Sequence, residues 1–270
     1  MKLAVNLSTI FSEVPLLQRF ALARAQGFEN VEIQFPYTLS ITEIQQQLQQ
    51  HQLQLCLINV PAADLMQGGA GLACVAGREA AFQHAVTQAI DYATQLQVPQ
   101  VNILAGRVGS EQSVEHGLTT LIDNLKWACP RFSAAGITPL IEVINGHSMP
   151  NFLLQTMAQA QQVLLQVQHP ALKIQYDCFH IAMMGEDILQ CFQQYHADIA
   201  HIQFADYPNR HEPNTGTLDF AAFFQLLDQY HYTGFVAAEY LPAQHSQQSF
   251  AWQQQFFPPP STRAGIDTPS

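Results

Sequence analysis

The sequence alternates short apolar segments with longer amphipathic ones over almost its whole length. The apolar segments have the length and composition of buried strands, and there are eight of them: residues 3–7, 31–35, 53–60, 101–104, 138–143, 172–177, 199–204 and 235–239. A segment with helical spacing follows each one: residues 15–26, 41–51, 78–97, 111–135, 156–168, 187–195, 220–231 and 244–255. Strands that alternate with helices pair in parallel, with both sheet faces covered. Eight such units predict an α/β fold, a single (β/α)8 TIM barrel.

The loops and the ends of the chain refine this prediction. No Gly-x-Gly-x-x-Gly motif follows the first strand, which argues against an open dinucleotide-binding sheet. We expect a catalytic barrel domain over residues 1–256 and an extended or disordered tail over residues 257–270, where three prolines follow one another. A Gly- and Ala-rich loop over residues 61–77 should lie on the face that carries the active site, as a mobile lid or as a passive loop.

The composition excludes several classes of function. The chain carries a formal net charge of −11 and no cluster of Lys and Arg, so it should repel nucleic acid and anionic membrane surfaces. No segment approaches the ~20 consecutive apolar residues of a membrane span. The five cysteines show no paired spacing, which is typical of a reducing compartment. We expect a cytoplasmic protein with a small-molecule partner, and self-association stays an open question.

Four side chains with oxygen donors stand at or near the ends of successive apolar segments. They are Glu142, Asp177, Gln203 and Glu239. In a (β/α) barrel the carboxyl ends of the strands build the active site, so these oxygens should converge. Three carboxylates in one small mouth would repel each other unless a cation neutralised them. Oxygen donors with a neutral glutamine favour a divalent metal, Mg²⁺ or Mn²⁺ rather than Zn²⁺.

Two carboxylates on either side of a metal can move a proton next to a carbonyl group. One removes a proton from the carbon that bears a hydroxyl, and the other returns a proton to the former carbonyl carbon. The cation polarises the carbonyl and stabilises the enediolate. Glu142 and Glu239 suit this pair because they end the fifth and eighth segments, roughly opposite in a closed ring. Asp177 and Gln203 would then complete the metal site.

Other polar residues follow the same strands and are candidates for contact with substrate. His180 lies three residues after Asp177, and Arg210 lies seven residues after Gln203. In an acidic protein, an arginine beside the metal could hold a substrate carboxylate or hydroxyl, and an arginine that pairs with Glu212 or with solvent is an equal alternative. Asn6 ends the first segment and is either a substrate contact or, more often for such a residue, a loop cap.

Several motifs together resemble the hydroxypyruvate isomerase family, which includes the 2-oxo-tetronate isomerases and belongs to the xylose isomerase-like barrels. The matching segments are Phe35–Tyr37 (FPY), Gly77–Glu79 (GRE), Ile141–Asn145 (IEVIN), Gln175–His180 (QYDCFH), His201–Ala205 (HIQFA), Arg210–Gly216 (RHEPNTG) and Ala238–Tyr240 (AEY). The resemblance runs from the first strand to about Trp252. It implies an isomerase that interconverts a 2-keto-3-hydroxy acid with its 2-hydroxy-3-aldehyde isomer. It also implies catalytic roles for Glu142 and Glu239, and a metal held by the four strand-end residues.

The chain departs from the family pattern in two loops. After Asn145 the family has an arginine and an aspartate where this chain has His147 and Ser148. In the seventh loop, Thr217 stands where the family often has a glutamate. If the family's arginine holds the substrate carboxylate, His147 would stand in its place. Because a histidine is mostly neutral near pH 7, it would hold a carboxylate less strongly than an arginine does. These changes leave the metal set intact and bear on the substrate.

Four other functions are compatible with parts of the pattern. A ketose 3-epimerase would use the same two carboxylates on one carbon and only invert a stereocentre. A dehydratase of the keto-inositol type would release water. A barrel endonuclease with several zinc ions would need more histidine ligands and a basic surface. A silent sugar- or acid-binding barrel would bind without turnover, which the intact pair Glu142 and Glu239 argues against.

Overall fold

The computed structural model of the 270-residue chain describes residues 1–109 and 112–258. Ser110, Glu111 and the expected tail from residue 259 onward lie outside the described residues. Phe257, which the sequence assigned to the tail, packs with its ring centroid 4.9 Å from that of Phe224. The described chain therefore stays packed on the barrel at least to this residue.

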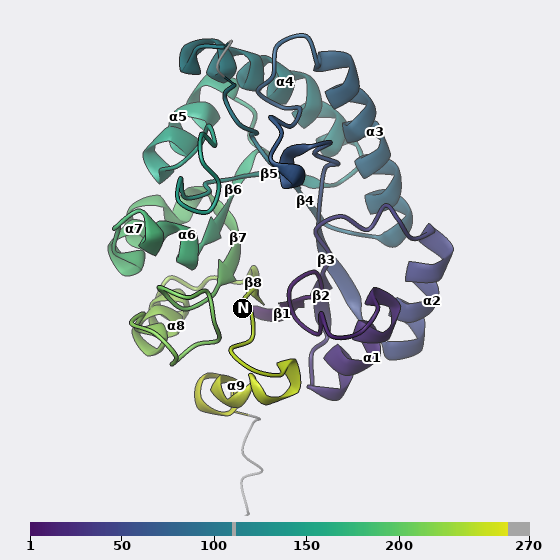
Figure 1. The fold of residues 1–270 in the computed structure, drawn as a ribbon, viewed down its shortest axis with the longest axis vertical. Coiled ribbons are helices and arrows are strands. Elements are labelled where there is room, and N and C mark those ends of the chain that lie inside the picture. Colours follow the sequence, from purple (N-terminus) through teal and green to yellow (C-terminus); the bar gives the residue numbers. More distant parts are fainter. Residues whose placement is uncertain (110–111, 259–270) are drawn as a thin grey trace, which may run out of the picture.

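Eight parallel strands close into a barrel in the order of the sequence, which confirms the predicted fold. The strands are β1 (Lys2–Asn6), β2 (Asn30–Glu32), β3 (Gln54–Asn59), β4 (Gln100–Ile103), β5 (Thr138–Glu142), β6 (Lys173–Asp177), β7 (Ile199–Phe204) and β8 (Phe235–Ala238). Pairing of β1 with β8 completes the ring. The loops that follow the strands gather over one end of the barrel (Figure 1).

Helices form the outer ring around the strands (Figure 1). They are α1 (Leu16–Ala25), α2 (Ile41–His51), α3 (Glu79–Leu96), α4 (Val114–Ala134), α5 (Met157–Val167), α6 (Cys178–Met183), α7 (Ile188–Tyr195), α8 (Phe220–Gln229) and α9 (Ala251–Phe256). Side chains that accept hydrogen bonds from free backbone N–H groups start several of them. Ser40 and Thr156 each form a reciprocal capping box with the residue three positions later. None of the described helices is both long and apolar enough to cross a bilayer.

Two elements differ from the sequence-based expectation. The short helix α6 follows β6 directly, because the Asp177 carboxylate accepts a hydrogen bond from the Phe179 backbone N–H at 2.8 Å and starts a helical turn. The expected helix over residues 244–255 is wrong in extent: a 3₁₀ turn (Ser246–Gln248) precedes α9. Ser246 is held by Glu13 and by the Phe11 backbone N–H, and these contacts tie the segment to the β1–α1 loop.

The register of the strands brings polar side chains to one level inside the barrel. Asn6 lies beside Glu32, Glu142 beside Gln175, and Asp177 beside Gln203. Below this level lies a small apolar cluster of Ala4, Cys56, Leu57, Leu140, Phe235 and Ala237. The buried side chains of Gln100 and His201 belong to strand positions in register with Leu57 and Phe235 of this cluster. The barrel therefore has a polar layer under its carboxyl end and a mixed layer of apolar and polar side chains below it. All five cysteines are buried and free.

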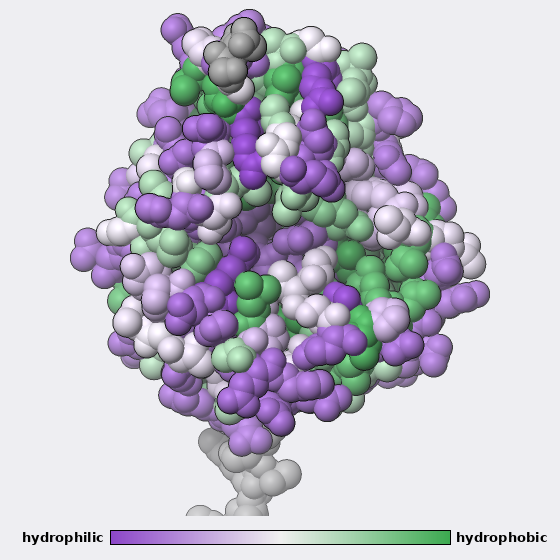
Figure 2. Space-filling model, in the orientation of Figure 1, coloured by the Kyte–Doolittle hydropathy of each residue, from purple (hydrophilic) through white to green (hydrophobic). Residues whose placement is uncertain are grey.

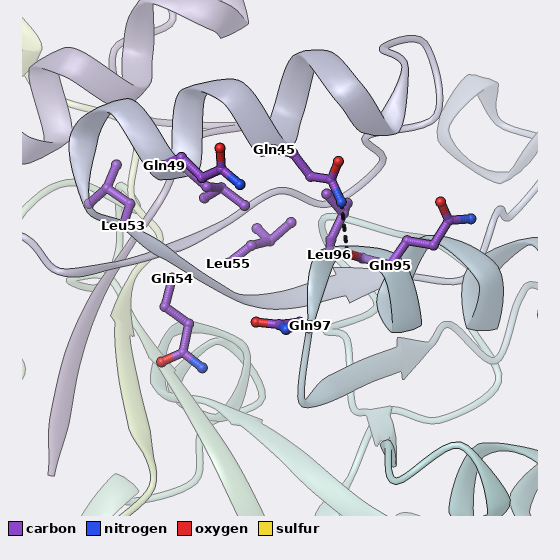
Figure 3. A pocket seen from close by; sticks show the side chains of 9 residues that line it. Gln45, Gln49, Leu53, Gln54, Leu55, Gln95, Leu96 and Gln97 are labelled. Atoms are coloured by element: carbon purple, nitrogen blue, oxygen red, sulfur yellow. Dashed lines mark hydrogen bonds between the residues drawn. The ribbon is translucent and has the colours of Figure 1, made fainter.

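The molecule also has a larger hollow on its outside, at the amino ends of β3 and β4. Its volume is about 440 Å³, and its walls are leucines and glutamines from α2, α3 and the adjoining turns (Figure 3). The Gln45 side chain there donates a hydrogen bond to the Gln95 carbonyl at 3.0 Å. None of the lining residues is titratable, so this hollow offers no acid–base chemistry.

Candidate active site

A cavity of about 200 Å³ lies at the carboxyl ends of the strands. Figure 2 shows hydrophilic side chains around a hollow near the centre of this face. The walls are formed by Gln34, Phe35, Asn59, Met66, Leu104, Glu142, Ile144, Ser148, Met149, Gln175, His180, Gln203, Arg210 and Glu239. Five of the residues predicted from the sequence are among them, and Asp177 borders the same cluster.

Three carboxylates are buried at the bottom of this cavity. Glu142 is 5% exposed, Asp177 1% and Glu239 2%. Ligand atoms of Glu142, Asp177 and His180 lie within 4.8 Å of one another. Asn102 donates a hydrogen bond to Glu142 Oε2 at 2.8 Å, whereas Asp177 Oδ2 has no hydrogen-bond partner among the described residues. A buried carboxylate oxygen without a partner is costly, so it is a natural place for a ligand or a cation.

Burial and charge repulsion raise the pKa values of Glu142 and Glu239. Burial raises the pKa of Glu142 well above its usual range, and the nearby Glu239 and Asp177 raise it further. Burial raises the pKa of Glu239 to about 7, although the Arg210 guanidinium opposes the shift. A carboxyl group with a pKa near neutrality can both take up and release a proton at physiological pH.

Arg210 supplies the positive charge in the described site. Its Nη2 lies 2.8 Å from Glu239 Oε2 and 3.6 Å from Asp177 Oδ2, and the guanidinium lies over the Phe179 ring. Burial alone would lower the pKa of Arg210, but the surrounding carboxylates outweigh it and raise the pKa. The alternative pairing with Glu212 is wrong, because that carboxylate accepts from the Ala243 backbone N–H instead.

The hydrogen bonds of His180 identify which of its nitrogens carries a proton. Asn145 Oδ1 accepts from the backbone N–H groups of His147 and Ser148, so Asn145 Nδ2 must donate to His180 Nδ1, at 2.6 Å. Burial lowers the pKa of His180 to about 4, so the ring is neutral at pH 7. Its single proton therefore sits on Nε2, 3.5 Å from Asp177 Oδ2. In this tautomer His180 is a hydrogen-bond donor rather than a metal ligand.

Two predicted substrate contacts lie outside the cavity wall. Asn6 is fully buried under the cavity, where its side chain donates to Glu32 and Glu239 and accepts from the Ser8 backbone N–H. It is thus a loop cap, as asparagine at such a position often is. The His147 side chain is exposed and is not among the lining residues. From the same loop, Ser148 and Met149 line the cavity instead.

The structure also brings in residues that sequence reasoning missed. Gln34 Nε2 donates a hydrogen bond to Glu239 Oε1 at 2.5 Å, and Gln175 lines the cavity beside Gln203. Glu32, at the end of β2, accepts a hydrogen bond from Gln203 at 2.8 Å. The rule that identified Glu142 and Asp177, a polar side chain at a strand end, also applies to Glu32.

The loop over residues 61–77 is anchored by arginines. Arg107 donates hydrogen bonds to the carbonyls of Leu65 and Gly69 at 2.9 and 3.0 Å. Arg78 donates to the Gly71 carbonyl at 2.7 Å and pairs with Asp64. The loop contains a 3₁₀ turn (Leu65–Gln67), and Met66 from this turn reaches the cavity. Closure of this loop over substrate stays a prediction.

The position of Arg210 depends on the buried carboxylate of Asp206. Asp206 Oδ1 accepts hydrogen bonds from the backbone N–H groups of Tyr207 and Leu218, and Oδ2 accepts from Gly216, all at 2.9–3.0 Å. Arg210 itself adopts a left-handed backbone conformation with φ +59°, which a residue other than glycine holds only when its surroundings impose it. The three hydrogen bonds to Asp206 close the loop between β7 and α8, and this closed loop holds Arg210 in its left-handed conformation.

Replacing Asp206 by alanine should therefore lower kcat/KM by at least ~10-fold, because a misplaced Arg210 weakens the site. The matched control is Asp187→Ala. Asp187 also accepts two backbone hydrogen bonds, but at the start of α7. Asp187→Ala should lose about 1 kcal/mol of stability, the usual cost of losing a helix cap. Asp206→Ala should lose more, because it leaves three backbone N–H groups without their acceptor. Steady-state kinetics and thermal denaturation compare them, and equal activity of the two variants would contradict a positioning role for Asp206.

Comparison with known proteins gives the relatives of this chain. A family model described as "Xylose isomerase-like TIM barrel" matches residues 20–256. A 2-oxo-tetronate isomerase of Cupriavidus necator is 33% identical over 93% of this chain and 96% of its own, and a hydroxypyruvate isomerase of Escherichia coli is 35% identical over 95% and 99%. A crystal structure from Brucella melitensis, titled "AP endonuclease, family 2", superposes with a TM-score of 0.91 at 32% identity, covering 94% of this chain and 98% of its own. The chain is an isomerase-type enzyme and belongs to the family of xylose isomerase-like TIM barrels.

Proposed function

We propose that this enzyme interconverts a 2-keto-3-hydroxy acid with its 2-hydroxy-3-aldehyde isomer, as in the pair hydroxypyruvate and tartronate semialdehyde or in a 2-oxo-tetronate. The observation that carries the proposal is the pair of buried carboxylates, Glu142 and Glu239, whose pKa values are raised at one small cavity. The names of the relatives support the same substrate class. A cavity of about 200 Å³ suits a substrate of a few carbon atoms.

The site fits a divalent cation. Three buried carboxylates repel each other, and Asp177 Oδ2 has no partner among the described residues. Glu142, Asp177, Gln203 and Glu239 would hold the ion, and their oxygen donors favour Mg²⁺ or Mn²⁺. Gln203 Oε1 accepts one hydrogen bond, from Gln175, which leaves its second lone pair for a ligand. When bound, the cation would polarise the substrate carbonyl and neutralise the carboxylates.

The protein groups can move the protons that isomerisation requires. One carboxylate removes the proton from the carbon bearing the hydroxyl, and the other delivers a proton to the former carbonyl carbon. Glu239, with its pKa raised to about 7 by burial, can serve in either direction near neutral pH. Arg210 and the Nε2–H of His180 lie beside these carboxylates and can donate hydrogen bonds to substrate oxygens as charge develops there.

Two rival functions differ from this proposal, one in the ligands that it needs and the other in its product. An endonuclease with several zinc ions needs several histidine ligands, but His180 is the one histidine among the described residues that line the cavity. The net charge of −11 would also repel DNA. A ketose 3-epimerase would use the same carboxylates, and product analysis separates it from an isomerase because only an isomerase moves the carbonyl group.

Replacing Glu239 by glutamine should keep the fold and reduce turnover by at least ~10²-fold, because it removes a proton-transfer group without changing its size. Proton NMR of hydroxypyruvate and the protein in D₂O, with Mg²⁺ or Mn²⁺ or with EDTA, measures both product and deuterium entry at carbon. Glu212→Gln, on the Arg210 loop, is the control and should remain near wild type. Near-normal turnover by the Glu239 variant would rule out the assignment.

The same variant should reveal the buried carboxyl in the pH dependence of stability. Burial raises the pKa of Glu239 from 4.5 to about 7 in the folded protein. Between these values the folded state keeps a proton that the unfolded state has lost, so wild-type stability falls as the pH rises through this window. With EDTA present, the Tm of Glu239→Gln minus that of the wild type should therefore increase from pH 4.5 to 7.5. A difference independent of pH would contradict the raised pKa.

A further inference from the structure

Gln175 has a buried oxygen atom without a hydrogen-bond partner. The residue lies on β6, two positions before Asp177, and its side chain lines the active-site cavity. It is 2% exposed, and its Oε1 has no hydrogen-bond partner in residues 1–109 and 112–258. The other end of the same amide is paired, because Nε2 donates a hydrogen bond to Gln203 Oε1 at 2.7 Å. A buried carbonyl oxygen left open beside a cavity is poised to accept from a ligand.

The orientation of this amide is fixed by its neighbour Gln203. A flipped Gln175 would place its oxygen against Gln203 Oε1, where two acceptors would face each other. Gln203 cannot turn to accommodate it, because its own Nε2 donates to Glu32 Oε2 at 2.8 Å. Turning Gln203 would bring its oxygen against a buried carboxylate. The direction of both amides therefore depends on Glu32.

Glu32 is itself held from two sides. Asn6 donates to its Oε2 at 3.1 Å, and His201 Nε2 pairs with its Oε1. Both Glu32 and His201 are completely buried. The other ring nitrogen, His201 Nδ1, faces Gln100 Oε1 at 2.7 Å, and that amide is oriented by its hydrogen bond to the Ala200 carbonyl. His201 thus faces Oε1 of Glu32, and Oε2 is the atom that accepts from Asn6 and Gln203.

We propose that Gln175 binds a substrate hydroxyl through its open Oε1, and that Glu32 is the positioning residue that keeps this oxygen turned toward the cavity. The inference deepens the proposed function, on which it rests for the nature of the ligand. It assigns the enzyme a preference for a hydroxylated acid over its deoxy analogue. A site that accepts from a ligand hydroxyl discriminates strongly against a ligand that lacks it, because the protein oxygen is then left buried and unpaired.

Three stable acids that differ by one hydroxyl test this preference: glycerate, lactate without the 3-hydroxyl, and 3-hydroxypropionate without the 2-hydroxyl. Calorimetry gives their affinities for the Mn²⁺-loaded protein without any need for turnover. In the wild type, glycerate should bind about 10-fold more tightly than at least one of the deoxy acids. Gln175→Leu should reduce the ratio of glycerate affinity to deoxy-acid affinity to about 1. If the ratio against lactate changes, Gln175 binds the 3-hydroxyl, and if the ratio against 3-hydroxypropionate changes, it binds the 2-hydroxyl.

A pair of variants at position 32 tests the positioning role. Glu32→Gln keeps an oxygen that can accept from Gln203, so it should preserve the wild-type ratio. Glu32→Leu removes the acceptor, frees both amides to turn, and should lower the ratio as Gln175→Leu does. The control Gln45→Leu removes an amide of the same kind from the outer hollow (Figure 3) and should leave the ratio unchanged. Thermal denaturation reports any loss of folding separately.

The outcomes separate this inference from the proposed function. If Gln175→Leu and Gln45→Leu show the same ratios as the wild type, the hydroxyl contact is wrong. If Gln175→Leu loses the preference but both Glu32 variants keep it, the positioning role of Glu32 is wrong. If wild-type protein binds glycerate selectively yet turns over no 2-keto-3-hydroxy acid, the proposed function fails and the contact stands. If glycerate does not bind while hydroxypyruvate is turned over, the hydroxyl contact is wrong and the proposed function stands.

Discussion

The burial of three carboxylates around one cavity is the constraint on which the rest of the site depends. Glu142, Asp177 and Glu239 are each nearly inaccessible to water. Burial raises the pKa of Glu142, which Glu239 and Asp177 raise further, and burial together with Asp177 raises the pKa of Glu239. A fold tolerates such a cluster only with positive charge or hydrogen-bond donors beside it. Arg210 is the cation that the described residues place beside these carboxylates, and its raised pKa is the reciprocal effect of the same carboxylates.

The elements of the barrel and the strand-end oxygens could be predicted from the sequence because both follow from periodicity. Apolar runs marked the strands, and closure of a parallel barrel brings their carboxyl ends together. Glu142, Gln203 and Glu239 therefore reached the cavity wall as expected, with Asp177 beside them. Sequence reasoning assigned the four oxygens to one metal ion, and it did not anticipate that Gln203 also forms hydrogen bonds with Gln175 and Glu32.

The residues that sequence reasoning missed or misplaced have two causes, a misplaced strand end and contacts that no local pattern encodes. Glu32 lay inside the expected strand over residues 31–35, whereas the observed strand ends at Glu32, so the strand-end rule was applied at the wrong residue. The outward direction of His147 follows from a turn organised by Asn145, and the β7–α8 loop takes its shape from Asp206. Each of these depends on side-chain to backbone hydrogen bonds within a loop, which periodicity does not reveal.

A line of hydrogen bonds runs from His201 through Glu32 and Gln203 to Gln175. The Glu32 carboxylate at the buried end of this line accepts from Gln203, and this hydrogen bond sets the orientation of both glutamine amides. A chain with a hydrogen-bond donor in place of that carboxylate would turn each amide over, and the cavity would then present an N–H where it now presents an oxygen. Substrate preference within this fold could therefore diverge through a residue that never meets the substrate, and the members of the line would be expected to change together during evolution.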